Sequence, residues 1–173
     1  MRAQVSLRAR VAAAAAAAIV VAVALLGLAV SALLGSQLTA SLDRSLRSRA
    51  VEVARLAAST PDLLTEPGAL EGRISGGALF VQVVDRSGRI VARSGGLGGR
   101  VLPADRLLTR ALRGRRSAYG DGALGSSPIR LYAAPLGAIG GGAAAGGAVV
   151  VAGTTADIED TLDTTRRLIA LCA

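Results

Sequence analysis

Residues 11–34 read VAAAAAAAIVVAVALLGLAVSALL, a run of twenty-four residues without a charged side chain. As an α-helix this run would be about 36 Å long, because each helical residue adds about 1.5 Å. The hydrocarbon core of a bilayer is only about 30 Å thick. The run therefore predicts a transmembrane helix, from which the rest of the chain is organised.

The charges that flank this run predict its orientation. Arg2, Arg8 and Arg10 precede it, and no acidic residue accompanies them. The cytoplasmic flanks of membrane spans carry an excess of basic residues. We therefore expect residues 1–10 in the cytoplasm and everything after Leu34 on the outer side of the cell membrane.

A cleaved secretory signal peptide is the alternative interpretation, because it also joins a basic segment to an apolar one. Val30, Ser31 and Ala32 would serve as a small-residue cleavage site. The apolar core of a signal peptide is roughly 7–15 residues long, which is shorter than this run. The length favours a retained anchor, and both interpretations export the remainder of the chain.

All 20 basic residues are arginine, and the sequence contains no histidine, lysine or asparagine. Without histidine the chain has no imidazole for acid–base catalysis or for a metal site. The single cysteine, Cys172, cannot form an internal disulfide. Asp62, Glu66 and Asp121 fall in predicted loops without a supporting catalytic motif. We therefore expect no enzyme, no catalytic residues, no metal and no cofactor.

Arginines are concentrated between Arg86 and Arg116, where nine of them accompany one acidic residue, Asp105. A nucleic-acid partner is not expected, because an exported segment with three aromatic residues offers little for base stacking. Small anionic ligands or anionic lipid head groups fit better, since guanidinium groups bind carboxylates and phosphates bidentately. The alternative is a solvated basic surface. The candidate ligand contacts are Arg93, Arg113, Arg115, Arg116, Tyr119 and Tyr132.

Helical spacing continues beyond the apolar run. Apolar residues recur there at three- and four-residue steps, namely Leu38, Leu42, Leu46, Ala50, Val53 and Ala57. Pro61 ends the helix, because it lacks an amide proton and restricts Thr60. We therefore expect a juxtamembrane helix over residues 35–60. Its apolar stripe either packs on its own domain alone or also pairs Ser36–Thr60 with a second copy as a homodimer.

The first half of the external domain contains the clearest strand signal. Ala78–Val84 is rich in β-branched residues, Asp85–Arg89 has turn residues, and Ile90–Arg93 returns as a second strand. Before this hairpin, Asp62–Gly77 predicts a loop with about one helical turn. After it, Gly95–Gly99 predicts a flexible link.

The second half predicts one helix and two further strands. Pro103 opens a helix over Ala104–Arg113, with Gly114 just past its end. Ile129–Leu136 and Gly147–Gly153 read as strands. The connection between these strands is almost wholly Gly and Ala, which predicts a mobile loop that no side chains hold in place.

The expected fold is α+β: a transmembrane helix continues into a long helix, and a small, mostly antiparallel sheet with helices follows. A last helix leads from Thr154 toward Arg167, and Leu168–Ala173 resembles the first turn of a second span. The predicted divisions are a cytoplasmic tail (1–10), a transmembrane helix (11–34), a juxtamembrane helix (35–60), an extracytoplasmic domain (61–165) and the start of a truncated second transmembrane helix (166–173).

This layout resembles the N-terminal sensing half of bacterial two-component sensor histidine kinases, particularly those of actinobacteria. The stretches that carry the resemblance are Ser41–Leu46, Val81–Ala92, Val149–Gly153, Asp157–Leu162 and Arg166–Leu168. The resemblance implies a PAS-like or Cache-like sensor domain that passes an external signal through the membrane. It covers most of the chain by the order of elements, but only short stretches by matching residues.

The sequence departs from such kinases in lacking a HAMP linker, a phospho-accepting histidine and an ATP-binding domain. Gly95–Gly99 and Gly140–Gly142 lack the strand–loop–helix context of a phosphate-binding loop. The resemblance therefore implies a signal-input module truncated before its kinase core. The alternative is a stand-alone, single-span envelope protein that binds partners without signalling, which the short cytoplasmic tail favours.

Overall fold

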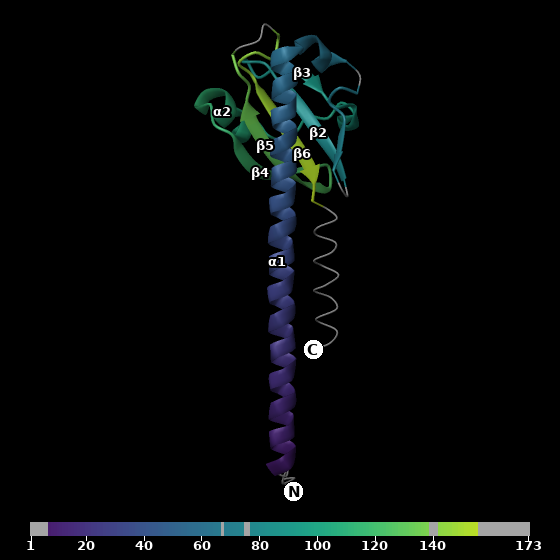
Figure 1. Ribbon diagram of the computed structural model, residues 1–173, viewed down its shortest axis with the longest axis vertical. Helices are drawn as coiled ribbons and strands as arrows, with labels where there is room; N and C mark the ends of the chain where they lie inside the picture. Colours follow the sequence, from purple (N-terminus) through teal and green to yellow (C-terminus); the bar gives the residue numbers. More distant parts are fainter. Residues whose placement is uncertain (1–6, 67, 75–76, 139–141, 156–173) are drawn as a thin grey trace. The chain divides into compact units, whose positions relative to one another are not determined.

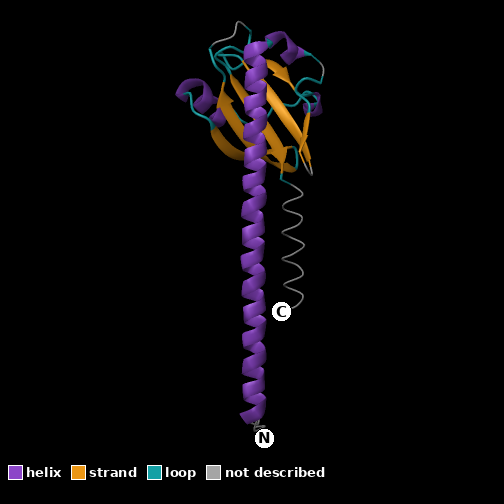
Figure 2. Cartoon of the chain, in the orientation of Figure 1, coloured by secondary structure: helices purple, strands orange, loops and turns teal. Residues whose placement is uncertain are grey.

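The computed structural model describes residues 7–66, 68–74, 77–138 and 142–155. A long N-terminal helix is followed by an antiparallel sheet with a second, short helix, so the predicted α+β class is confirmed (Figure 2). The predicted helix after Thr155 and the second span lie outside the described residues, as does most of the cytoplasmic tail.

Helix α1 (Leu7–Ser59) runs for 53 residues without a break. Among the described residues it is the one helix that is long and apolar enough to cross a membrane, judged by length and composition, and none of its most apolar window is buried. The helix ends before Pro61, as predicted, and the 3₁₀ helix η1 (Pro61–Thr65) follows directly.

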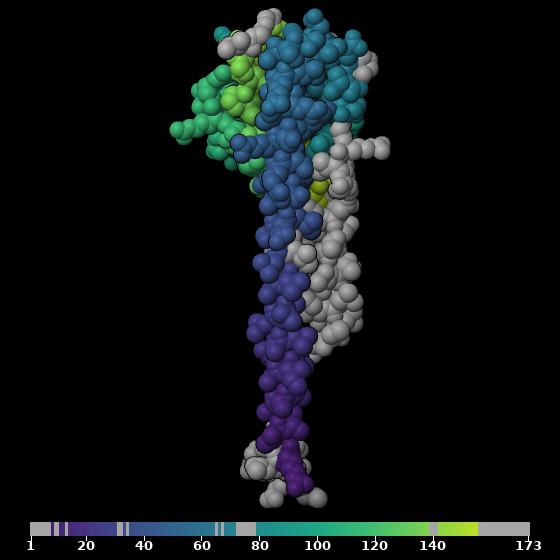
Figure 3. Space-filling model, viewed as in Figure 1, coloured from purple at the N-terminus to yellow at the C-terminus, as the bar shows by residue number. Residues whose placement is uncertain are grey.

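The second half of α1 belongs to the compact unit Thr39–Asp157, which also contains the sheet. Four members of the predicted apolar stripe are buried there: Leu42, Leu46, Ala50 and Val53. In the space-filling view this part of α1 covers the sheet (Figure 3). The stripe therefore packs on its own domain, and these four side chains are not available to a second copy.

The sheet has the strand order β1-β2-β6-β5-β4, and β3 also pairs with β2. The strands are β1 (Gly72–Ile74), β2 (Gly77–Val84), β3 (Ile90–Arg93), β4 (Ala118–Leu124), β5 (Ser127–Pro135) and β6 (Ala148–Thr154). Strand β1 pairs with the first residues of β2 and β3 with its last ones, while β6 pairs along the opposite edge. The hairpin β2–β3 and the strands β5 and β6 were predicted from the sequence.

Helices cover both faces of the sheet, and α1 is the helix that lies across its front in Figure 1. Helix α2 (Asp105–Gly114) packs on one face, where Ala111 joins a core that includes Val150 and Ala152 of β6. Successive residues of a strand point to opposite faces, so Gly153 points to the other face and lies against Leu42 of α1. Burial on both faces explains the unbroken apolar run of β6.

Strands β1 and β4 were not predicted from the sequence. In β4, two glycines obscure the strand pattern, and both serve close packing. A Cβ atom on Gly120 would lie 3.1 Å from Leu107 of α2, and one on Gly122 would lie 3.1 Å from Leu131. Asp121, between these glycines, lies on a strand and not in the predicted loop.

The prediction that Gly95–Gly99 is a flexible link is wrong. It contains a second 3₁₀ helix, η2 (Gly95–Leu97), and Leu97 is fully buried in the core. The preceding Ser94 is held to β2 by two hydrogen bonds, because its amide donates to the Val81 carbonyl (2.9 Å) and its hydroxyl accepts from the Val81 amide (3.0 Å).

The predicted end of α2 and the loop after β5 also differ from the structure. Gly114 is the last residue of α2, and Arg115 follows it in the left-handed conformation with φ 50°. The described part of the Gly/Ala-rich connection is held by backbone hydrogen bonds, among them one from the Gly146 amide to the Gly137 carbonyl (2.8 Å). The Arg115 side chain also binds the Leu136 and Gly146 carbonyls, so the prediction that no side chains hold this loop is wrong for the described residues. Residues 139–141 lie outside the described part of the chain.

Candidate functional site

A cluster of charged and aromatic side chains joins α1 to the sheet. We call it the clamp, and it consists of Asp43, Tyr119, Asp121, Arg130 and Tyr132. At its centre the Arg130 guanidinium donates from Nε to Oδ1 of Asp43 (2.9 Å) and from Nη2 to Oδ2 (3.1 Å). This two-point contact is the geometry in which guanidinium and carboxylate bind each other most specifically.

The pairing of β4 with β5 brings the sheet's share of the clamp together. Asp121 stands opposite Arg130, and Tyr119 stands opposite Tyr132. Residues two apart on a strand share a face, so all four side chains lie on the face that α1 covers. The Nη1 atom of Arg130 donates to both carboxylate oxygens of Asp121, at 2.8 and 2.9 Å.

The two tyrosines extend this contact along the sheet. The Tyr119 hydroxyl donates to the backbone carbonyl of Asp43 (3.2 Å), and the Tyr119 and Tyr132 ring centroids are 4.6 Å apart. The guanidinium carbon of Arg130 lies 5.5 Å from the centre of the Tyr119 ring, within cation–π range. Two strands therefore contact one short stretch of α1.

The electrostatics keep the clamp charged. Hydrogen bonds from Arg130 to Asp43, and then to Asp121, raise the pKa of the Arg130 guanidinium above its ordinary value. Burial, with smaller effects from Tyr132 and Asp43, raises the pKa of the Tyr119 hydroxyl. The side chains of Arg130 and Asp43 are 21% and 23% exposed, so water screens this pair less than an ordinary surface pair.

A second contact ties α1 to the segment before β1. Arg49 of α1 donates from Nη2 to the backbone carbonyl of Glu71 (2.6 Å) and from Nη1 to Glu52 (2.6 Å). Its Nε is buried and has no hydrogen-bond partner among the described residues. The helix is thus attached to β5 through Arg130 and to the approach of β1 through Arg49.

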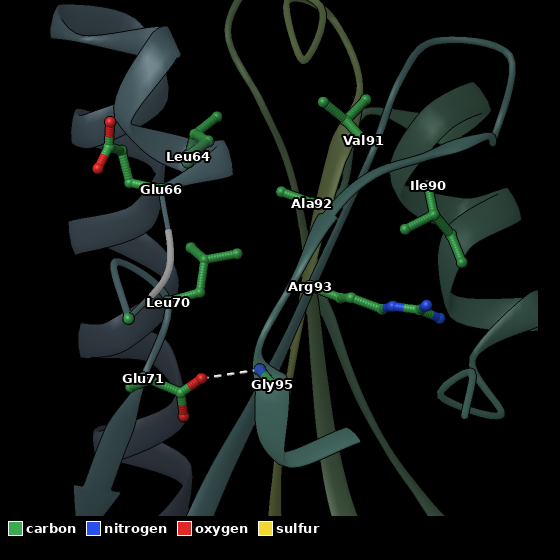
Figure 4. A pocket seen from close by; sticks show the side chains of 10 residues that line it. Leu64, Glu66, Leu70, Glu71, Ile90, Val91, Ala92, Arg93 and Gly95 are labelled. Atoms are coloured by element: carbon green, nitrogen blue, oxygen red, sulfur yellow. Dashed lines mark hydrogen bonds between the residues drawn. The ribbon is translucent and has the colours of Figure 1, made fainter. Parts of the chain in front are cut away.

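A groove of about 590 Å³ lies between this segment and β3 (Figure 4). Leu64 and Leu70 lie across from Ala92 in the close-up, and the Glu71 carboxylate accepts a hydrogen bond from the Gly95 amide (2.7 Å). The groove is lined by Leu64, Glu66, Gly68, Leu70, Glu71, Ile90, Val91, Ala92, Arg93 and Gly95. Its described charged groups are mostly carboxylates, so it is poorly suited to an anion.

The structure does not gather the six predicted ligand contacts at one place. Arg93 leaves β3 away from the groove wall formed by Leu64 and Leu70, and it donates to the Gly99 carbonyl (3.0 Å). Arg113 and Arg116 are exposed at the end of α2. Tyr119 does meet an arginine, but it is Arg130 of the clamp, and Tyr132 contacts the Tyr119 ring.

Three residues of the clamp, Asp43, Asp121 and Arg130, were not selected from the sequence. Arg130 carries the clearest signal in retrospect, because it is a lone charge between Ile129 and Leu131 in an apolar strand. Such a residue is retained in a half-buried position only when partners compensate for its loss of water. The identity of those partners depends on strand pairing and on helix docking.

Neither a protein-family model nor a curated protein matches this chain. Across the described residues, no group of three or more cysteines, aspartates and glutamates gathers as a metal site would require. The clamp, the attachments of α1 and the exposed arginines are therefore the features from which a function is inferred.

Proposed function

We propose that this chain is the signal-input module of a membrane-bound two-component sensor kinase, in which an external domain moves the helix that crosses the membrane. One observation carries the proposal: α1 is a single uninterrupted helix that includes the candidate membrane span and also packs against the sheet. Because the helix is continuous, a displacement of its second half relative to the sheet is passed along its axis.

The contact between Arg130 and Asp43 would be made in one position of α1 and broken in another. Helix shifts in signalling proteins are typically about 1–2 Å. A shift of that size would lengthen hydrogen bonds of 2.9 and 3.1 Å beyond bonding range and separate Arg130 from Asp43. A signal moves α1 only if it stabilises one of the two positions more than the other. In this proposal the arginine-rich N-terminus is cytoplasmic and the sheet domain is external.

A chimera tests the proposal. Residues 1–173, continued by the second span, HAMP linker and kinase core of a characterised sensor kinase, are reconstituted in lipid nanodiscs, and autophosphorylation is measured. Asp43→Asn and Arg130→Met each release the clamp and should change basal autophosphorylation at least threefold.

Arg106→Gln is the matched control, since it removes an arginine on the exposed side of α2 and should leave the output within error. If both clamp variants fold and give the output of the parent chimera, the input-module proposal fails. A stand-alone anchor predicts that result.

A further inference from the structure

The guanidinium groups of Arg86 and Arg115 meet at Gly146. Arg115 donates from Nη1 to the Gly146 carbonyl (3.3 Å) and from Nη2 to the Leu136 carbonyl (3.0 Å). Arg86 also lies against this glycine, because a Cβ atom built on Gly146 would be 2.8 Å from its Nη2 and 3.0 Å from its Nε. Two positive charges from different elements thus reach one residue.

Among the described residues, the ion pairs of Arg49, Arg89 and Arg130 include neither of these two arginines. Asp85, which precedes Arg86, is committed to its own turn, since it accepts hydrogen bonds from Ser87 and from Arg89. Two guanidinium groups beside one residue repel each other, so an anion that both contact makes the arrangement more favourable.

Backbone strain places one of the two guanidinium groups. Arg115 is the only non-glycine residue with a positive φ among the described residues, at 50°. Glycine is the usual residue just after a helix, because it adopts this conformation without steric cost. Here the glycine, Gly114, stands one position too early. Strained residues of this kind occur preferentially at functional sites.

Three elements converge around the two arginines. The turn between β2 and β3 lies next to α2, because a Cβ atom on Gly88 would be 4.0 Å from Leu112. The third element is the described end of the connection before β6, residues 142–147, to which Gly146 belongs. Arg113 and Arg116, both exposed, flank Arg115 in the sequence.

We infer that Arg86 and Arg115 form a binding site for a phosphate group, with Arg113 and Arg116 adding to the local positive charge. A tetrahedral oxyanion offers oxygens in several directions, and it can therefore accept hydrogen bonds from two guanidinium groups that arrive from different elements. The phosphate is a free inorganic ion or a soluble phosphate ester.

This inference rests on the proposed function, for which it supplies the ligand class and a route to the clamp. Leu136, whose carbonyl Arg115 binds, directly follows β5, and the clamp residues Arg130 and Tyr132 lie in that strand. Tyr132 is three residue steps from Pro135, or about 10 Å along the strand. A bound phosphate would order the end of β5 that follows the clamp.

Titration of the full chain with inorganic phosphate tests the site. The chain is held in nanodiscs of zwitterionic lipid at near-physiological salt, and binding is followed by calorimetry. Arg86→Gln should weaken phosphate binding at least tenfold. Arg44→Gln removes the same charge from the exposed side of α1 and should change the affinity less than twofold.

Arg115→Gly guards against a folding artefact, because glycine relieves the left-handed conformation while it removes the guanidinium. Because the variant also loses the hydrogen bonds to the Leu136 and Gly146 carbonyls, its unfolding midpoint is measured beside that of the parent chain. It should stay folded and should lose phosphate binding. A second set of nanodiscs contains phosphatidic acid, and protection of Arg115 from a guanidinium-modifying reagent only in these nanodiscs would contradict a soluble ligand.

The inference is overturned if phosphate does not bind below about 10 mM. It is also overturned if Arg86→Gln and Arg115→Gly bind phosphate as tightly as the parent chain. Either result leaves the chimera test of the clamp unaffected, because that test uses no ligand. Failure of the input-module proposal would in turn leave the phosphate affinity unchanged.

Discussion

Arg130 of β5 donates two hydrogen bonds to the carboxylate of Asp43 on α1, across 87 positions of sequence. The pair joins the interior of the sheet to the helix that includes the candidate membrane span. Because both side chains are largely shielded from water, the contact should contribute more than an ordinary surface ion pair.

Replacement of Asp43 by alanine should lower the free energy of unfolding by about 1–2 kcal/mol, because Arg130 loses its two-point partner in a half-buried position. Urea denaturation of the full chain in detergent micelles, followed by circular dichroism, measures this change.

Asp121→Ala is the control for Asp43→Ala. The Asp121 side chain is 76% exposed, so its pair with Arg130 should contribute about 0.5 kcal/mol or less. Equal losses from both substitutions would contradict a special contribution of the contact between α1 and the sheet.

Gly153→Val should destabilise the contact of α1 with β6. A Cβ atom at this position would lie 3.0 Å from Leu42 and 3.5 Å from Leu46, both buried. Overpacking of this kind costs about 1–3 kcal/mol. The denaturation midpoint of the full chain in micelles reports it.

Gly114→Ala is a matched glycine replacement, since its nearest neighbour would be Arg110 at 3.9 Å. This replacement lies in α2 and should stabilise the protein by about 0.4–1 kcal/mol. If Gly153→Val leaves the denaturation midpoint of the parent chain unchanged, α1 does not pack closely on β6.

Leu46→Ala and Val51→Ala distinguish the two sides of α1. Leu46 is fully buried, and its truncation should cost about 2–5 kcal/mol. Val51 is 46% exposed, and its truncation should cost about 0.5 kcal/mol or less. Thermal unfolding in micelles separates the two values. The reverse order would mean that the apolar stripe faces a second copy and not its own sheet.

The hairpin turn predicts a dependence of stability on acidity. The hydrogen bond from the Ser87 hydroxyl, followed by bonds from Arg89 and the Ser87 amide, lowers the pKa of Asp85 to about 2. An unfolded aspartate has a pKa of about 3.9. The ionised carboxylate therefore stabilises the fold fully above about pH 4, and this contribution is lost as the pH falls toward 2.

Unfolding midpoints of the full chain, measured between pH 6 and pH 2, test this dependence. Asp85→Asn should fall less steeply than the parent chain below about pH 4, and Ser87→Ala should lie between the two. Identical slopes for all three chains would rule out a stabilising role for the Asp85 carboxylate.

The elements that were predicted from the sequence have strong local patterns. Helix α1 has an apolar run followed by a three- and four-residue repeat, and the hairpin β2–β3 combines β-branched residues with the turn Asp85–Arg89. Strand β4 was missed because Gly120 and Gly122 weaken the strand pattern. The two glycines allow Leu107 and Leu131 to approach β4 closely, and these contacts exist only after the chain has folded.

Of the candidate sites, too, some residues were predicted from the sequence and their partners were not. Tyr119, Tyr132 and Arg115 were predicted from the sequence as contacts of a ligand, and in the structure each contacts another group of the protein. Their partners were not predictable, because Asp43 is 76 positions from Tyr119 and Gly146 is 31 positions from Arg115. Local spacing carries no information about which distant groups will meet.

The sequence by itself determined the apolar helix, its uninterrupted continuation and the α+β class, since these follow from hydropathy and residue spacing along the chain. Only the tertiary structure decided that the stripe of α1 is covered by its own sheet, that Arg130 pairs with Asp43, and that Arg86 and Arg115 meet at Gly146. Charged groups find their partners through strand register and helix docking, which depend on the packing of the whole domain.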